Sequence, residues 1–252
     1  LKKRFDNLGW VHAPGSYAVT INVDPSSNEK EHRISLLSEK PGEVIKYTTN
    51  GSDPTINSLT YHNPIKINQR TVVKASMFID GIQKGKTSKK TIFFSKAIGK
   101  KVEYNSQYSD RYTGSGPLTL VDGLTGSIAH NDNYWQGWHE DDMDVTIDLS
   151  KIESLSRISM GFLESHGSWI FLPTRVMVSF SDDGISYKKQ IKIQITDGKR
   201  GGAANRVECE SENLNVFARY VKVKAINRKR CPEWHPGSGG KTWVFSDEII
   251  VE

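Results

Sequence analysis

Hydrophobic and polar residues alternate with a period of two through residues 17–95, in short runs rich in β-branched and aromatic side chains. Because successive side chains of a strand point to opposite faces of a sheet, this alternation predicts strands that are buried on one face. Turn signals separate the runs at close spacing, with Asn50-Gly51 and Asp53-Pro54 as strong markers. The pattern therefore predicts a small β-sandwich. Its strands are expected at residues 18–23, 32–36, 44–49, 71–78 and 91–94.

A second series of strands follows residues 96–106, where the character of the sequence changes. The runs are again short, long polar loops separate them, and helical periodicity is almost absent. Seven or more strands joined by such loops favour a second sandwich, of jelly-roll type. The predicted fold class is therefore all-β, with two β-sandwiches in series. The strands of the second sandwich are expected at 144–149, 155–162, 175–181, 189–195, 205–209, 218–226 and 249–251.

The first ten residues, LKKRFDNLGW, have a helical pattern instead. Leu1, Phe5 and Leu8 would lie on one helical face, and a glycine follows where a helix would end. A short amphipathic helix is marginal in water without a partner surface. We therefore interpret residues 1–15 as the last turns of a helix that belongs to a preceding domain.

Composition and charge exclude several classes of partner. No apolar run approaches the length of a membrane span, so membrane insertion is not expected. The net charge of +5 is uneven: residues 1–97 carry 15 Lys and Arg against 8 Asp and Glu, and residues 98–252 carry 19 against 21. No basic stripe with a nucleic-acid motif appears, so we expect no nucleic-acid partner. The two cysteines, Cys209 and Cys231, could pair or remain free thiols.

The segment from Thr119 to Trp138 has the composition of a binding loop. Its turn, Asp122-Gly123-Leu124-Thr125-Gly126-Ser127, offers a carboxylate, hydroxyl groups and several carbonyls within six residues. Glycines let the backbone fold back so that these oxygens converge. Convergent oxygens suit a hard cation, above all calcium, but this turn needs a second carboxylate from elsewhere in the chain.

Catalytic motifs are not evident. There is no nucleophile elbow of the form G-x-S-x-G and no histidine spacing of a zinc site. The acidic run from Glu140 to Asp144 is consecutive on a loop, whereas glycoside hydrolysis needs two carboxylates on opposite sides of a bond. Asp182-Asp183-Gly184 has the sequence of a turn between two strands. We therefore expect no catalytic activity from this chain.

Tryptophans on loops provide the clearest binding signal. Trp169 lies in Gly167–Pro173, and Trp234 lies between two prolines in Cys231–Pro236. A sugar-binding site combines aromatic faces, which stack on the ring, with polar groups that bind the hydroxyls. The alternative is that most of the six tryptophans are core residues, as is common in small sandwiches.

Motifs in both halves resemble known families. YTTNGSDPT at Tyr47–Thr55, with the motifs at 61–65 and 71–75, is similar to the chitobiase/β-hexosaminidase C-terminal domain, a fibronectin type III-like sandwich. The second half resembles the discoidin domain, also called F5/8 type C, which includes carbohydrate-binding module family 32. The matching pieces are Asp122-Gly123-Leu124, Trp135-Gln136-Gly137, 145–149, 181–184, 218–221 and 245–249.

The combination resembles the C-terminal part of a bacterial β-N-acetylhexosaminidase of glycoside hydrolase family 20. It implies a helix remnant at 1–15, a fibronectin type III-like domain at 16–97 and a discoidin-like domain at 98–252. It also implies a non-catalytic accessory region whose catalytic barrel would precede Leu1, in a periplasmic, cell-surface or secreted protein. Its expected partners are a glycan and its own catalytic domain. The alternative is that both sandwiches only buttress that barrel.

The resemblance also implies a structural calcium site. In the discoidin family an Asp and nearby carbonyls of the first loop hold the ion together with a Glu near the C-terminus. The corresponding groups are the Asp122 and Glu248 carboxylates and the carbonyls of Thr119, Leu124 and Asp247, together with Ser127. Ser127 stands where the family usually has Thr, so its hydroxyl is retained. Such an ion would join the first loop to the last strand.

Sugar sites of this family lie on loops at one end of the sandwich. The residues expected at the site are Trp138, His139, His166, Trp169, Arg175, Trp234 and His235. Arg175 would bind hydroxyls, and Trp138 is expected at the surface whereas Trp135 is expected in the core. The alternative for this set is packing against the catalytic barrel.

Overall fold

The structure is a computed structural model, which describes residues 17–24, 31–38, 44–195 and 198–252. The helix expected at residues 1–15 lies outside the described residues. The chain divides into two compact units between Phe94 and Ser95. Ser95 and Lys96 belong to the second unit because Val251 N–H donates to Ser95 Oγ at 3.0 Å and Lys96 N–H donates to Val251 O at 2.7 Å.

The first unit consists of two antiparallel sheets. β1 (Val19–Val23), β2 (His32–Ser38) and β5 (Ile65–Ile67) form one sheet in that order. β4 (Leu59–Thr60), β3 (Val44–Thr48), β6 (Thr71–Ile79) and β7 (Ile82–Ile92) form the other. Alternate side chains from both sheets are buried in one core that includes Ile34, Leu36, Val73, Ala75 and Met77. The predicted sandwich is confirmed.

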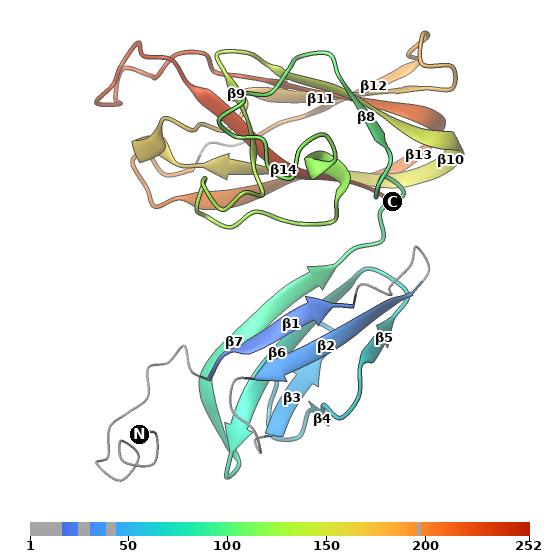
Figure 1. The fold of residues 1–252 in the computed structure, drawn as a ribbon, viewed down its shortest axis with the longest axis vertical. Helices are drawn as coiled ribbons and strands as arrows, with labels where there is room; N and C mark the ends of the chain where they lie inside the picture. The colour runs from blue at the N-terminus through green and yellow to red at the C-terminus, as the bar shows by residue number, and fades with distance from the viewer. Residues whose placement is uncertain (1–16, 25–30, 39–43, 196–197) are drawn as a thin grey trace. The chain divides into compact units, whose positions relative to one another are not determined.

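The second unit contains the remaining strands and two short 3₁₀ helices, η2 (Thr119–Val121) and η3 (His166–Ser168). Its sheet has the order β12-β11-β13-β10-β14-β9, and β8 pairs with β10. Figure 1 shows these strands stacked in two layers. The bounds are β8 Lys101–Tyr104, β9 Gln136–His139, β10 Met143–Glu164, β11 Arg175–Ser181, β12 Lys189–Ile193, β13 Asn205–Ile226 and β14 Trp243–Val251.

Two long strands, β10 and β13, connect the layers. The first half of β10 pairs with β8, its second half pairs with β14, and β13 follows it in antiparallel register along both halves. The register shifts between Asp148 and Glu153 and again between Leu155 and Arg157. Such irregularities bend a strand. The pairing is that of a jelly roll, which confirms the predicted all-β fold class.

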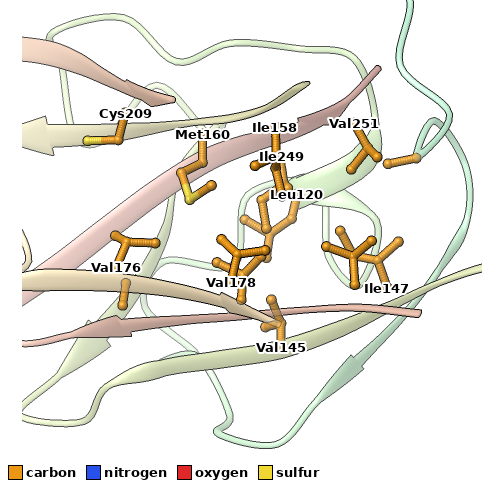
Figure 2. Packing of buried hydrophobic residues seen from close by; sticks show 14 of the residues in the cluster. Leu120, Val145, Ile147, Ile158, Met160, Val176, Val178, Cys209, Ile249 and Val251 are labelled. Atoms are coloured by element: carbon orange, nitrogen blue, oxygen red, sulfur yellow. The ribbon is translucent and has the colours of Figure 1, made fainter. Parts of the chain in front are cut away.

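The hydrophobic core of the second unit lies between the layers. Figure 2 shows Ile158, Met160 and Ile249 on one side, pointing toward Val176 and Val178 on the other. Valine and isoleucine suit this position because their branched side chains pack well on a pleated surface.

The strand predictions were wrong at the bends. Residues 144–149 and 155–162 were expected as two strands, as were 205–209 and 218–226, but each pair is one strand. Ser150, Lys151 and Ile152 are less buried than their neighbours, because β10 leaves one layer there to enter the other. Alternation therefore stops although the strand continues.

Cys209 and Cys231 are buried free thiols. Burial raises the pKa of Cys209 to about 11.

No helix in the described part of the chain is long and apolar enough to span a membrane.

Candidate functional site

Three loops of the second unit enclose a pocket of about 720 Å³. They connect β10 to β11, β12 to β13 and β13 to β14. Small-molecule sites in proteins are concave and usually have volumes of about 300–1,000 Å³. This pocket therefore has the size of a ligand site. The residues that line it are His166, Phe171, Gly198, Arg200, Arg228, Pro232, Glu233 and Trp234.

Aromatic rings form one wall of the pocket. The Trp234 ring meets the edge of His166, with 4.9 Å between centroids, and Phe171 lies 6.1 Å from Trp234. Buried His235 packs beneath them, 5.5 Å from the Phe171 ring and 5.8 Å from the Trp234 ring. Because these rings support one another, Trp234 presents a fixed apolar surface to the pocket.

Buried polar groups attach the loop at residues 198–202 to the end of β10. Glu164 Oε1 accepts a hydrogen bond from Gly198 N–H at 3.0 Å, and His166 Nδ1 accepts one from Gly201 N–H at 3.1 Å. His166 Nε2 lies 3.2 Å from Glu164 Oε1. Since Nδ1 accepts a hydrogen bond, we assign the ring proton to Nε2, where it faces Glu164. The Glu164 and His166 side chains thus hold the loop that carries Arg200.

Two arginines add positive charge to the pocket. The Arg200 guanidinium carbon lies 5.9 Å from the centre of the Trp234 ring, and that of Arg228 lies 5.9 Å from the centre of Phe171. A guanidinium over an aromatic face is held by a cation–π interaction. The pocket therefore combines aromatic surface with several N–H donors.

The structure brings some of the predicted sugar-binding residues together. His166 and Trp234 line the pocket. Trp169, which is 41% exposed, lies beside it and packs on Gly237 and Gly240 of the same loop as Trp234. Its backbone is left-handed, with φ of 62°, and its N–H donates to His166 O at 2.8 Å.

The predicted surface position of Trp138 is wrong. Its side chain is 0% exposed, and its Nε1 donates to Ser106 O at 3.0 Å within the core. Trp135 is buried as expected. His235 is also inaccessible, because it is buried and both ring nitrogens contact backbone groups, His166 O at 2.9 Å and Gly237 N–H at 3.0 Å. Its role is to support the wall rather than to contact a ligand.

His139 and Arg175 lie away from the pocket lining. The His139 ring is stacked on Trp243 with 4.4 Å between centroids. Arg175 is exposed at the start of β11, where it pairs with Ile226 of β13. Neither side chain is among those that line the pocket.

Arg200, Arg228 and Glu233 line the pocket but were not predicted from the sequence. Arg200 lies in a Lys-Arg-Gly-Gly stretch and Arg228 in an Arg-Lys-Arg stretch. Such runs are usual on solvated surfaces, so they gave no specific signal before the loops were placed in space.

The proposed calcium residues form a second site, where the loop after η2 meets β14. Glu248 Oε2 accepts a hydrogen bond from Gly123 N–H at 3.0 Å, whereas its buried Oε1 has no hydrogen-bond partner among the described residues. Burial raises the pKa of Glu248 well above its usual range, and repulsion from the Asp122 carboxylate is the second cause. Burial likewise raises the pKa of Asp122, which accepts hydrogen bonds from Ser115 and Leu124. Two interacting carboxylates with an orphaned buried oxygen fit a cation.

The side chains of the other proposed ligands, Asp247, Ser127 and Thr119, are already hydrogen-bonded within the protein. Arg206 binds both Asp247 oxygens, so only the peptide carbonyl of Asp247 remains for a cation. Trp135 Nε1 donates to Ser127 O, and Ala129 N–H donates to Ser127 Oγ, so both groups of Ser127 already accept hydrogen bonds. The one proton of the Thr119 hydroxyl has two acceptors in reach, Thr113 O at 3.1 Å and Gly116 O at 2.9 Å. The carbonyls of Thr119 and Leu124 are the ligands that the family resemblance implies.

The described residues contain no group of three or more His, Cys, Asp and Glu side chains suited to a metal ion. A site with two carboxylates and several carbonyls would not form such a group. Calcium takes six to eight oxygen ligands and accepts backbone carbonyls among them. The donors present are therefore compatible with calcium.

Two family models match the chain. The F5/8 type C domain model matches residues 101–244, and the Fn3 associated model matches residues 34–92. The first match covers more than half of the chain. The chain matches no curated protein.

Several solved structures are similar to this chain. A Streptococcus pneumoniae fucose binding module is 17% identical, with coverage of 69% of this chain and 97% of the module and a TM-score of 0.43. The lectin binding domain of lectinolysin complexed with Lewis b is 18% identical, with coverage of 62% and 94% and a TM-score of 0.41. Chitosan-binding module 1 of a Paenibacillus sp. IK-5 chitosanase/glucanase is 14% identical, with coverage of 62% and 96% and a TM-score of 0.37.

Proposed function

Because this chain belongs to the F5/8 type C domain family, we propose that its second unit is a non-catalytic carbohydrate-binding module that binds a glycan in the pocket beside Trp234. The observation that carries the proposal is the pocket itself. It combines the rigid indole of Trp234 with the donors of Arg200 and the carboxylate of Glu233. A pyranose ring needs this combination, since its C–H face is apolar and its hydroxyls need hydrogen-bond partners.

Replacement of Trp234 by alanine is expected to weaken glycan binding at least tenfold. Burial of an aromatic side chain contributes about 1.5–3 kcal/mol, and a factor of ten corresponds to about 1.4 kcal/mol. Glycan-array screening of the chain, followed by titration of a positive glycan into both proteins, measures this loss. The matched control is Tyr134→Ala, which removes an exposed aromatic side chain outside the pocket.

Equal affinity of the Trp234→Ala variant and the unchanged chain would place the glycan elsewhere. No binding at millimolar glycan would contradict the proposal and favour the alternative, that both units only support a neighbouring domain.

We further propose that the chain is an accessory region of a bacterial β-N-acetylhexosaminidase that acts outside the cytoplasm, in the periplasm, on the cell surface or after secretion. The support is the sequence resemblance of both halves. Tethering by the second unit would raise the local concentration of glycan at the catalytic domain. Turnover of an aryl N-acetylglucosaminide by this chain alone would contradict the assignment.

We also propose that Asp122 and Glu248 hold a structural calcium ion together with backbone carbonyls of Thr119, Leu124 and Asp247. The ion would neutralise two carboxylates that burial keeps close together. It would also fix the loop after η2 to the last strand of the unit.

Chelation of calcium is expected to lower the melting temperature of the second unit by about 5–10 °C. Calcium at a hundredfold excess over its dissociation constant stabilises a folded protein by about 2.7 kcal/mol, and 1 kcal/mol corresponds to about 2–4 °C at this size. Glu248→Gln should abolish the response to calcium, and Asp182→Asn, which changes an exposed carboxylate on another loop, should retain it. Scanning calorimetry with calcium and with EDTA measures both effects. Identical melting curves of the unchanged chain in the two conditions would rule out the site.

A further inference from the structure

We propose that the pocket selects glycans that carry a negatively charged group, a carboxylate or a sulfate ester, and that Arg200 binds this group. The inference rests on the proposed glycan-binding function and specifies its substrate class. It follows from Arg200, which has no ion-pair partner among the described residues, and from the way the loop that carries Arg200 is held.

Arg200 differs from several basic residues on the adjoining segments. There Arg230 and Lys241 both contact Glu140, and Lys229 lies 3.5 Å from Asp142. Arg200 makes no ion pair with any residue of the described ranges, and its guanidinium lies beside the Trp234 ring. A negatively charged group on the ligand would give Arg200 an ion-pair partner.

The buried carboxylate nearest this loop is already engaged. Glu164 lies behind the loop, where its Oε1 accepts the Gly198 N–H and faces His166 Nε2. It is not among the residues that line the pocket. Glu164 therefore acts as a positioning residue for the loop and does not face a ligand.

The Arg200 loop is fixed before a ligand binds. Backbone N–H groups on both sides of Arg200 are held by Glu164 and His166, which are both buried, and Gly202 N–H donates to Lys199 O at 2.8 Å. The guanidinium rests near the Trp234 face. A pre-positioned group loses little conformational freedom on binding, which increases affinity.

Arginine has the right chemistry for an acidic sugar. Its planar guanidinium donates two parallel hydrogen bonds to a carboxylate or sulfate, and these bonds are about twice as strong as neutral ones. The Trp234 face can hold the sugar ring while the Arg200 fork binds the charged substituent. A neutral sugar would use the stacking face but leave the charge without a partner.

The test compares matched ligands by calorimetric titration into the full chain. The probes are methyl galactoside, methyl galacturonide and methyl galactoside 6-sulfate, together with the corresponding glucose series. At 50 mM salt we expect at least one charged ligand to bind tenfold or more tightly than its neutral parent, and the preference to shrink at 500 mM salt because salt screens the interaction. Comparison of the galacturonide with the 6-sulfate shows whether the recognised group is a carboxylate or a sulfate ester.

Arg200→Gln is expected to remove the preference while binding of the neutral parent changes less than threefold. Arg200→Lys keeps the positive charge but cannot donate two parallel hydrogen bonds to one anionic group. It should therefore retain only part of the preference for charged over neutral ligands. Arg230→Gln is the matched control, since it removes one positive charge from an adjoining loop without changing the lining, and it should leave the preference intact.

The outcomes separate this inference from the proposed function. Equal binding of neutral and charged ligands, lost in Trp234→Ala, would overturn the acidic class and leave glycan binding in place. A preference that survives Arg200→Gln would overturn the role of Arg200. Absence of binding for every probe at 10 mM, together with an empty glycan array, would overturn both proposals.

Discussion

Asp247→Ala is expected to lower the free energy of unfolding of the second unit by about 3–5 kcal/mol, because it breaks a buried ion pair from one side. Asp247 is 0% exposed, and its two oxygens accept hydrogen bonds from Arg206 at 2.5 and 3.1 Å. The same carboxylate accepts Gly126 N–H at 2.9 Å and Glu248 N–H at 2.7 Å. Alanine would leave the Arg206 charge and two backbone donors without this partner.

Urea denaturation of both proteins measures the loss. Asp182→Ala is the control, since its exposed pair with Lys188 should contribute at most about 1 kcal/mol. The loss in the free energy of unfolding for Asp247→Asn should lie between those for Asp247→Ala and Asp182→Ala, because asparagine keeps the shape of the side chain and part of its hydrogen bonding. A change below 1 kcal/mol for Asp247→Ala would show that water replaces the carboxylate and that the network adds little stability.

Trp138→Ala is expected to destabilise the second unit by about 3–5 kcal/mol, and to lower its melting temperature by about 6–20 °C, because it removes a large side chain from a packed core. The indole lies in the main core cluster of the unit, with its N–H on Ser106 O and its ring 6.4 Å from that of Tyr108. Thermal unfolding measured by circular dichroism gives the shift.

Trp138→Phe should destabilise the second unit less than Trp138→Ala, because phenylalanine keeps most of the side-chain volume. Both variants lose the hydrogen bond to Ser106 O. Glycan affinity measured below the melting transition should remain within about threefold for Trp138→Phe, because the residue does not line the pocket. Lost glycan binding in a Trp138→Phe protein with unchanged melting would restore Trp138 as a ligand contact.

The sequence predicted the architecture of the chain well because its strands alternate. β1, β2, β3 and β6 lie within a residue or two of the predicted runs, and in β1 and β2 the buried positions are two residues apart. Short strands such as β4, with two residues, have too few positions for a period to appear. The domain limits at residues 15 and 97 stay predictions, although the contact boundary falls near the second one.

The site was less predictable than the fold. His166 and Trp234 were expected because tryptophan and histidine on proline- and glycine-rich loops are typical of sugar sites, and both line the pocket. The prediction that Trp138 lies at the surface was wrong for a physical reason. Trp138 is buried in β9, and this strand is too short for the sequence to show which face is buried. Arg200 and Arg228 come from loops 28 positions apart, and their proximity depends on the pairing of β13 with its neighbours.

Ser95 and Val251 are hydrogen-bonded neighbours, so the second unit begins and ends at one place. A domain with adjacent ends can be placed within a loop of another protein without forcing the two flanking segments apart. The same property allows its ends to be joined by a few residues and reopened at an exposed turn. The second unit could therefore be moved as one insert, and the residues that line the pocket beside Trp234 would move with it, since all of them lie within this unit.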